Sequence, residues 1–144
     1  MHKTDRSIVV GTDGSQTASV AVARGAELAR LLSAKVHLVC AVKAPLSRHF
    51  DPTATAAMEF AMEDAHRVLK DAADRLRGMG VKVENHAIFA EAAEALLQTA
   101  EEENAELLVV GSKGMSGAGR YLLGSVPNKV SHHASCNVLI VRTG

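Results

Sequence analysis

The chain has 144 residues and a mass of 15.2 kDa, so we expect residues 1–144 to form a single domain. Lys plus Arg and Asp plus Glu number 16 each, and this zero net charge argues against a partner that is a nucleic acid or an anionic membrane surface. Aromatic residues make up only 3% of the chain, which also argues against the stacking platforms of single-strand binders.

The first third of the chain alternates short apolar runs with a helical pattern. Residues 8–10 form a β-branched run that ends at Gly11, and residues 36–42 form a second apolar run, so both predict strands. Between them, residues 16–33 carry apolar side chains at intervals of three and four, which predicts an amphipathic helix. Ser15 is a suitable N-cap for this helix, because its hydroxyl can accept from a first-turn amide.

A longer helix is predicted after a loop over residues 44–51. Its start at Asp51 and Pro52 is favourable, since proline fits the first turn of a helix. Apolar residues then recur at intervals of four and three, several of them methionines, and we expect this stripe to pack in the core. Glycines at 78 and 80 end the helix. The remaining elements are predicted as strand, helix, strand, helix and strand at residues 81–89, 92–103, 107–110, 126–134 and 138–141.

This order predicts an α/β fold with an open parallel sheet and helices on both faces. Four of the five strands are nearly continuous apolar runs, as a sheet that is covered on both faces requires. In such sheets a ligand binds at the carboxyl ends of the strands, where the strand order reverses. The segments that follow the strands are therefore where we expect a binding site.

Two of these segments are unusual. Strand 1 is followed by Gly-Thr-Asp-Gly-Ser at residues 11–15, and strand 4 by a segment over residues 111–125 that holds five of the 11 glycines. Successive amides in a Gly-rich turn and the free amides of the next helix favour an anion, and Lys113 and Arg120 add positive charge. An exposed linker, or an ordinary helix cap at Ser125, is the alternative.

Two well-known phosphate motifs are absent. Arg120 and Tyr121 stand where a Walker A loop requires Lys and Ser or Thr. Leu122 stands where the third glycine of a dinucleotide-binding fingerprint would lie.

The spacing Gly111-x2-Gly114-x9-Gly124-Ser125 is similar to the nucleotide-binding signature of the universal stress protein family. Residues 8–15 resemble the first strand and loop of that family, and the resemblance covers essentially the whole chain. It implies a Rossmann-like, adenine nucleotide alpha hydrolase-like fold with a five-stranded parallel sheet in the order 3-2-1-4-5. It also implies a homodimer formed through the last strand, from Asn137 to Arg142.

The resemblance implies an adenine nucleotide as the ligand, ATP first, with AMP or cyclic AMP as alternatives. Relatives with a similar loop and Gly-Ser-Val-Pro ending can bind cyclic AMP. Asp13 would hold Mg²⁺ or Mn²⁺ through the phosphates, or would simply cap the first helix. The residues implied to bind the nucleotide are Gly11, Thr12, Asp13, Ala41, Val42, Val110, Gly111, Ser112, Lys113, Gly114, Gly124, Ser125 and Val126.

The implied role is that of a nucleotide-dependent signalling module in a stress response. An enzyme that hydrolyses ATP slowly and a nucleotide-free dimeric scaffold remain alternatives, although we find no water-positioning base and no arginine finger in the sequence.

The remaining reactive residues predict no further chemistry. The adjacent His132 and His133 would point about 100° apart on a helix, and the histidines show no metal-ligand spacing, so we expect them in solvent or at helix ends. Cys40 and Cys136 form no C-x-x-C pair and are expected to be buried free thiols in a reducing compartment. No apolar stretch reaches the ~20 residues needed to cross a bilayer, and a cytoplasmic location is expected.

Overall fold

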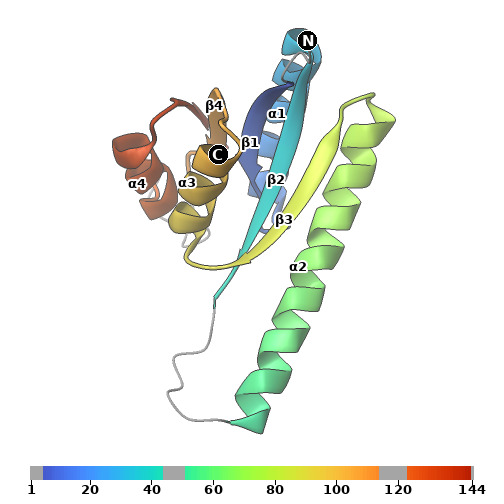
Figure 1. The fold of residues 1–144 in the computed structure, drawn as a ribbon, viewed down its shortest axis with the longest axis vertical. Helices are drawn as coiled ribbons and strands as arrows, with labels where there is room; N and C mark the ends of the chain where they lie inside the picture. The colour runs from blue at the N-terminus through green and yellow to red at the C-terminus, as the bar shows by residue number, and fades with distance from the viewer. Residues whose placement is uncertain (1–4, 44–50, 114–122, 144) are drawn as a thin grey trace.

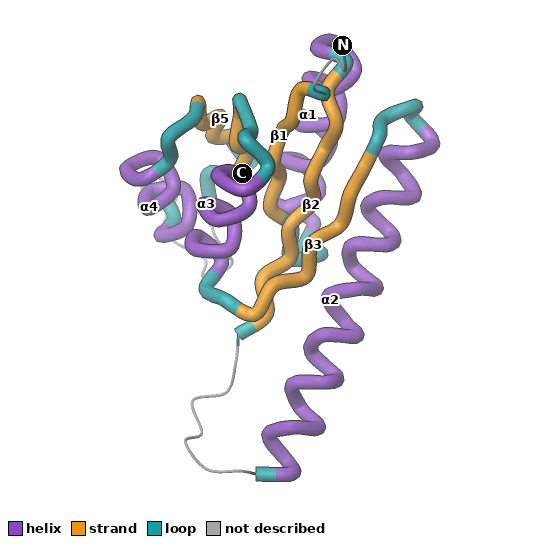
Figure 2. The backbone as a smooth tube through the Cα atoms, in the orientation of Figure 1, coloured by secondary structure: helices purple, strands orange, loops and turns teal. Residues whose placement is uncertain are grey.

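The computed structural model of the chain describes residues 5–43, 51–113 and 123–143. Its five parallel strands form one sheet in the order β3-β2-β1-β4-β5, which confirms the predicted topology (Figure 1; β5 is labelled in Figure 2). The strands are β1 (Arg6–Gly11), β2 (Ala34–Val42), β3 (Val83–Phe89), β4 (Leu107–Gly111) and β5 (Asn137–Val141).

Helices cover both faces of this sheet. Helices α1 (Gln16–Leu32) and α2 (Pro52–Gly78) pack on one face, and α3 (Ala92–Glu102) and α4 (Ser125–His133) pack on the other. The side chains of β1 alternate between the two cores, since Val10 lies in the core beneath α1 and α2 and Val9 in the core beneath α3 and α4. This two-sided burial explains why the strand reads as an uninterrupted apolar run.

The predicted helix caps at Ser15 and Asp51 are confirmed, whereas α4 begins at Ser125 with Gly124 as its N-cap. The Ser15 hydroxyl accepts from the amide of Ala18 at 3.1 Å, and the Asp51 carboxylate accepts from the amide of Thr53 at 2.9 Å. Both contacts satisfy first-turn amides that have no partner within the helix. Gly80, with a φ of +83°, adopts the left-handed backbone that follows the end of α2.

Helix α2 is longer than the sheet it covers, and this corrects one prediction. Its 27 residues span about 40 Å, whereas the seven residues of β3 span about 23 Å. The buried side chains therefore all lie from Ala65 onward, and the first turns of α2 extend beyond the strands (Figure 2). Met58 at that end is only partly buried, and Met79 at the other end is 38% exposed, so the apolar stripe is not core along its whole length.

Candidate functional site

A cleft lies at the carboxyl ends of β1, β2 and β4 and is bordered by the starts of α1, α3 and α4. Strand order reverses at this point, because the chain after β1 crosses to β2 on one side and the chain after β4 crosses to β5 on the other. This is the position at which open parallel sheets bind ligands. The cleft is lined by eight of the residues predicted from the sequence: Gly11, Thr12, Asp13, Ala41, Val110, Gly111, Lys113 and Val126.

The loop after β1 is held by hydrogen bonds within itself and to β2. The Thr12 amide donates to the carbonyl of Val39 at 2.9 Å, which continues the β1–β2 ladder by one residue. The Ser15 amide donates to Asp13 Oδ1 at 2.9 Å, and the Gly14 amide donates to Thr12 Oγ1 at 3.2 Å. Asp13 therefore shapes the turn before α1, while Ser15 provides the helix cap.

Two glycines in this loop allow close packing. Gly14 has a φ of +83°, and a Cβ built there would lie 2.8 Å from a methyl group of Val68 on α2. At Gly11 the same atom would lie 3.0 Å from a methyl group of Leu96 on α3. The loop backbone thus lies directly between the two helical layers.

Ser112 joins the three segments that meet beyond β4. Its amide donates to the carbonyl of Val141 at 2.7 Å, and its carbonyl accepts from the amide of Gly124 at 3.0 Å. Its hydroxyl accepts from the amide of Thr143 at 3.1 Å. The two described ends of the glycine-spaced motif, at Gly111 and Gly124, are therefore fixed close together. Gly114, also predicted to contact the nucleotide, lies outside the described residues.

The N-terminus of α4 adds polar character to the cleft. Gly124 is the N-cap residue, and among the described residues no side chain caps the first turn or adds an acidic group to it. Pro127 has no amide hydrogen, and the amide of Asn128 donates to the carbonyl of Gly124, which leaves the amides of Ser125 and Val126 at the positive end of the helix dipole. With Lys113 in the same cleft, this arrangement suits an anion.

Some predicted residues take other positions. The side chain of Val42 lies in the core beneath α1 and α2, because it points to the opposite face of the sheet from Ala41. Ser112, Gly124 and Ser125 lie beside the cleft without lining it.

Sequence reasoning missed seven lining residues. Val39 could have been inferred, since it shares a strand face with Ala41, and Leu96 belongs to the apolar stripe of α3. Together with Ala41 and Val110, these side chains form an apolar wall beside the polar end of the cleft. The cleft can therefore hold a molecule with a flat apolar part and an anionic part. The missed residues are Ser15, Thr17, Ala18, Val39, Ala92, Leu96 and Pro127.

The expectation for the histidines is correct for His132 and His133, which are exposed in the last turn of α4, and wrong for His37. His37 lies on β2 and is only 1% exposed. Its ring contacts His86 of β3, which is far away in the sequence, so no local spacing could reveal the pair.

Both cysteines are free thiols, as predicted. Cys40 is buried, and this burial raises the pKa of its thiol to about 11, with smaller contributions from the charges of Asp13 and Asp64. Cys136 is only partly buried, so the expected burial is wrong for this thiol. A thiol with the raised pKa of Cys40 is protonated near neutral pH and is a poor nucleophile.

Among the helices that the structure describes, none is both long enough and apolar enough to cross a membrane.

Comparison with known proteins gives a consistent result. A sequence profile of the Universal stress protein family matches residues 5–142. The chain is 39% identical over 145 residues to the universal stress protein Rv1636 of Mycobacterium tuberculosis, which covers 96% of this chain and 97% of that relative. A solved universal stress protein in complex with cAMP is 31% identical, with a TM-score of 0.77 over 99% of this chain and 100% of its own. A solved member of the family from Burkholderia pseudomallei is 30% identical, with a TM-score of 0.76 and 98% of each chain covered.

Proposed function

Because the chain belongs to the universal stress protein family, we propose that it binds an adenine nucleotide, ATP first, in the cleft at the carboxyl ends of β1, β2 and β4. It would act in the cytoplasm as a nucleotide-dependent module of a stress response. The observation that carries this proposal is the position of the cleft at the reversal of strand order, with an apolar wall at one side and a positive helix end at the other.

The two parts of the cleft match the two parts of a nucleotide. The side chains of Val39, Ala41 and Leu96 offer an apolar surface for the flat face of a base. Lys113 and the first amides of α4 offer charge and hydrogen-bond donors for phosphate oxygens.

Asp13 is suited to a metal ion that accompanies the phosphates. Mg²⁺ and Mn²⁺ prefer oxygen ligands, and Mg²⁺ is commonly held by one or two carboxylates together with substrate phosphates. One oxygen of Asp13 accepts from the Ser15 amide, so the second oxygen of the same carboxylate can serve the ion.

Cyclic AMP is the second candidate ligand. The observation that favours it is the 31% identical universal stress protein whose structure holds cAMP. A cyclic monophosphate carries a single negative charge, so it would depend less on Lys113 than a triphosphate does.

The test is a thermal unfolding scan and calorimetric titration with ATP, AMP, cyclic AMP and GTP. A nucleotide at 100 times its dissociation constant should stabilise the folded chain by about 2.7 kcal/mol. Lys113→Gln should weaken ATP binding about tenfold or more, since it removes a charged contact to phosphate, and should affect cyclic AMP less.

The matched control is Lys82→Gln. This exposed lysine lies just before β3, at the amino end of the sheet, so the variant makes the same charge change away from the cleft. Its nucleotide affinity should equal that of the wild type. If no nucleotide alters the unfolding temperature, the proposed function is wrong.

We also propose that the chain forms a homodimer through β5. This strand is an edge of the sheet, and its apolar residues Val138, Leu139 and Ile140 are partly exposed in the single chain. An apolar edge strand is a suitable surface for a second copy of the same strand.

A further inference from the structure

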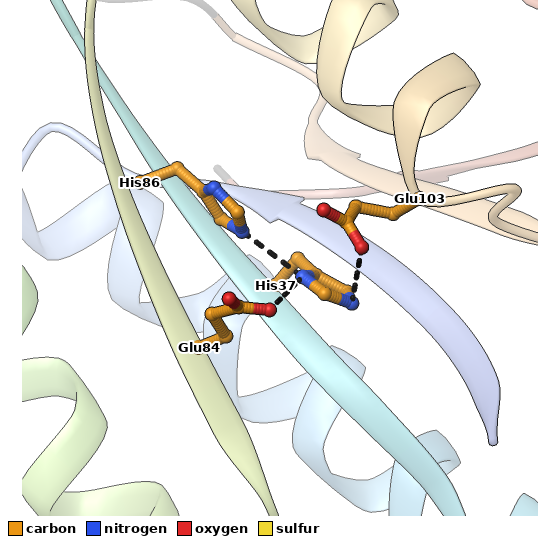
Figure 3. A group of neighbouring side chains, drawn as sticks. All are labelled: His37, Glu84, His86 and Glu103. Atoms are coloured by element: carbon orange, nitrogen blue, oxygen red, sulfur yellow. Dashed lines mark hydrogen bonds and ion pairs between the residues drawn. The ribbon is translucent and has the colours of Figure 1, made fainter.

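Four potential metal ligands meet on the face of the sheet that α3 covers. His37 lies on β2, Glu84 and His86 lie on β3, and Glu103 directly follows the last residue of α3. One nitrogen or oxygen atom from each side chain lies within 4.8 Å of the corresponding atoms of the other three (Figure 3).

Strand pairing brings these residues together. His37 is the register partner of Glu84, and the next residue but one on β3 is His86, which therefore points to the same face. Helix α3 packs on this face, and its C-terminal end places Glu103 next to His37. Three of the four groups are thus held by strands of the sheet, which position side chains more precisely than loops do.

Three of the four ligand atoms lie at distances close to those of a coordination sphere. His37 Nδ1 lies 2.9 Å from His86 Nε2 and 3.3 Å from a carboxylate oxygen of Glu84. In a tetrahedral zinc site with bonds near 2.05 Å, neighbouring ligand atoms lie about 3.4 Å apart. An oxygen of Glu103 lies 3.8 Å from the other ring nitrogen, His37 Nε2, so the Glu103 carboxylate has to turn toward Nδ1 to become the fourth ligand.

Burial and a neighbouring lysine shift the pKa values of two of these groups in the same direction. Burial lowers the pKa of His37, and this effect exceeds the opposing influence of the Glu103 charge. A hydrogen bond from Lys35, whose Nζ lies 3.1 Å from the carboxylate, lowers the pKa of Glu84.

The cluster is accessible from one side. The side chain of Glu84 is 46% exposed and that of Glu103 is 34% exposed, whereas His37 forms the buried base. An ion can therefore enter between β3 and the end of α3. The side chain of Lys35, which is 33% exposed, can move into solvent when a cation replaces it next to Glu84.

From this geometry we propose that His37, Glu84, His86 and Glu103 form a binding site for one divalent transition-metal ion, with zinc as the ion that the ligand set fits best. Two imidazole nitrogens and two carboxylate oxygens suit Zn²⁺, while Mg²⁺ and Ca²⁺ prefer oxygen ligands alone. His37 lies two residues along β2, about 7 Å, from Val39 in the wall of the proposed nucleotide cleft, and the metal site does not depend on the proposed function.

The test uses the full chain without an affinity tag, treated with a chelator and then titrated with zinc chloride in a calorimeter. We expect one zinc ion per chain and, with cobalt(II) as the probe, the intense visible absorption of a tetrahedral complex. His86→Gln and Glu103→Gln should each reduce the affinity at least about tenfold, because even an outer-shell change commonly costs 10- to 100-fold. Glu103→Gln decides the question if the substitution on β3 disturbs folding.

Two further variants make the test specific. His66→Gln removes an exposed imidazole from α2 and should leave zinc binding unchanged. Lys35→Met removes the cation that competes for Glu84, so it should tighten zinc binding, and an unchanged affinity would contradict the assignment of Glu84 as a ligand. If the wild type takes up no zinc at micromolar concentration, or if His86→Gln and Glu103→Gln bind it as well as the wild type, the four side chains form a hydrogen-bonded cluster only and the proposal is wrong.

Discussion

At the scale of single residues, the cleft depends on backbone positions that accept no side chain. Gly14 combines a left-handed backbone with a neighbouring methyl group of Val68 only 2.8 Å from where a Cβ would lie. The turn between β1 and α1 therefore needs glycine for two independent reasons, one conformational and one steric.

Gly14→Ala should lower the free energy of unfolding by about 2 kcal/mol, because it adds the cost of a left-handed backbone for alanine to a steric overlap. Urea denaturation measures this change. Gly78→Ala is the matched control, since nothing lies within 4 Å of a Cβ at that position in α2, and there the substitution should stabilise the chain by about 0.5–1 kcal/mol. Equal effects of the two variants would show that the geometry at Gly14 imposes no constraint.

At the scale of secondary structure elements, a negative charge at the N-terminus of α4 should affect the stability of the chain and its binding of a phosphate in opposite directions. An acidic side chain in the first turn of a helix stabilises it, and among the described residues α4 has none there. The same side chain would repel a phosphate held by the first amides of the helix.

Ser125→Glu should therefore change two measurements in opposite directions. The unfolding free energy should rise by about 0.5 kcal/mol from the helix dipole, and the affinity for ATP should fall about tenfold or more. Ser125→Gln is the matched control, because glutamine has nearly the same size as glutamate and no charge. It should therefore show neither the gain in stability from the helix dipole nor the electrostatic repulsion of the phosphates. Full ATP affinity in Ser125→Glu would place the phosphates away from α4.

The elements themselves could be predicted from the sequence, because each depends on local signals. Periodicity locates the strands and helices, and the caps at Ser15 and Asp51 locate two helix starts. The relation between elements depends on strand register and helix length, which local patterns do not contain. Sequence reasoning therefore missed the meeting of His37 with His86 and the extension of α2 beyond the sheet.

The candidate site shows the same division. The segments after β1 and β4 could be recognised from their glycines and their spacing, and they do meet at the cleft. The resemblance named both Ala41 and Val42, but only the pairing and packing of β2 show that Ala41 faces the cleft and Val42 the opposite core. The apolar wall formed with Leu96 depends on how α3 packs across the sheet, which the sequence pattern alone does not define.

At the scale of the whole molecule, the sheet offers different features at its ends and edges. The proposed nucleotide cleft lies at the carboxyl ends of the strands, and the proposed metal site lies further toward the amino ends on the α3 face. The edge at β3 carries polar residues such as Glu84 and Asn85, both exposed, whereas the edge at β5 is apolar. This asymmetry favours β5 over β3 as the edge that meets a second copy of the chain.

The register of β5 shows which of its backbone groups remain for a partner. The carbonyl of Val141 accepts from Ser112, so Val141 and, by alternation, Leu139 direct their backbone groups toward β4. Ile140 then directs its amide toward the free edge. Ile140→Pro should remove that donor while the β4–β5 ladder remains, since proline is tolerated on the open side of an edge strand.

In a two-fold symmetric dimer the Ile140→Pro change occurs twice, so two hydrogen bonds of about 1 kcal/mol each are lost and the dimer dissociation constant should rise roughly 30-fold. Sedimentation equilibrium measures this constant, and a thermal scan checks that the chain still folds. Leu139→Pro is the contrasting variant, because it breaks the ladder to β4 and should lower the unfolding temperature of the chain itself. A dimer that remains equally tight in folded Ile140→Pro would show that the two chains meet through another surface.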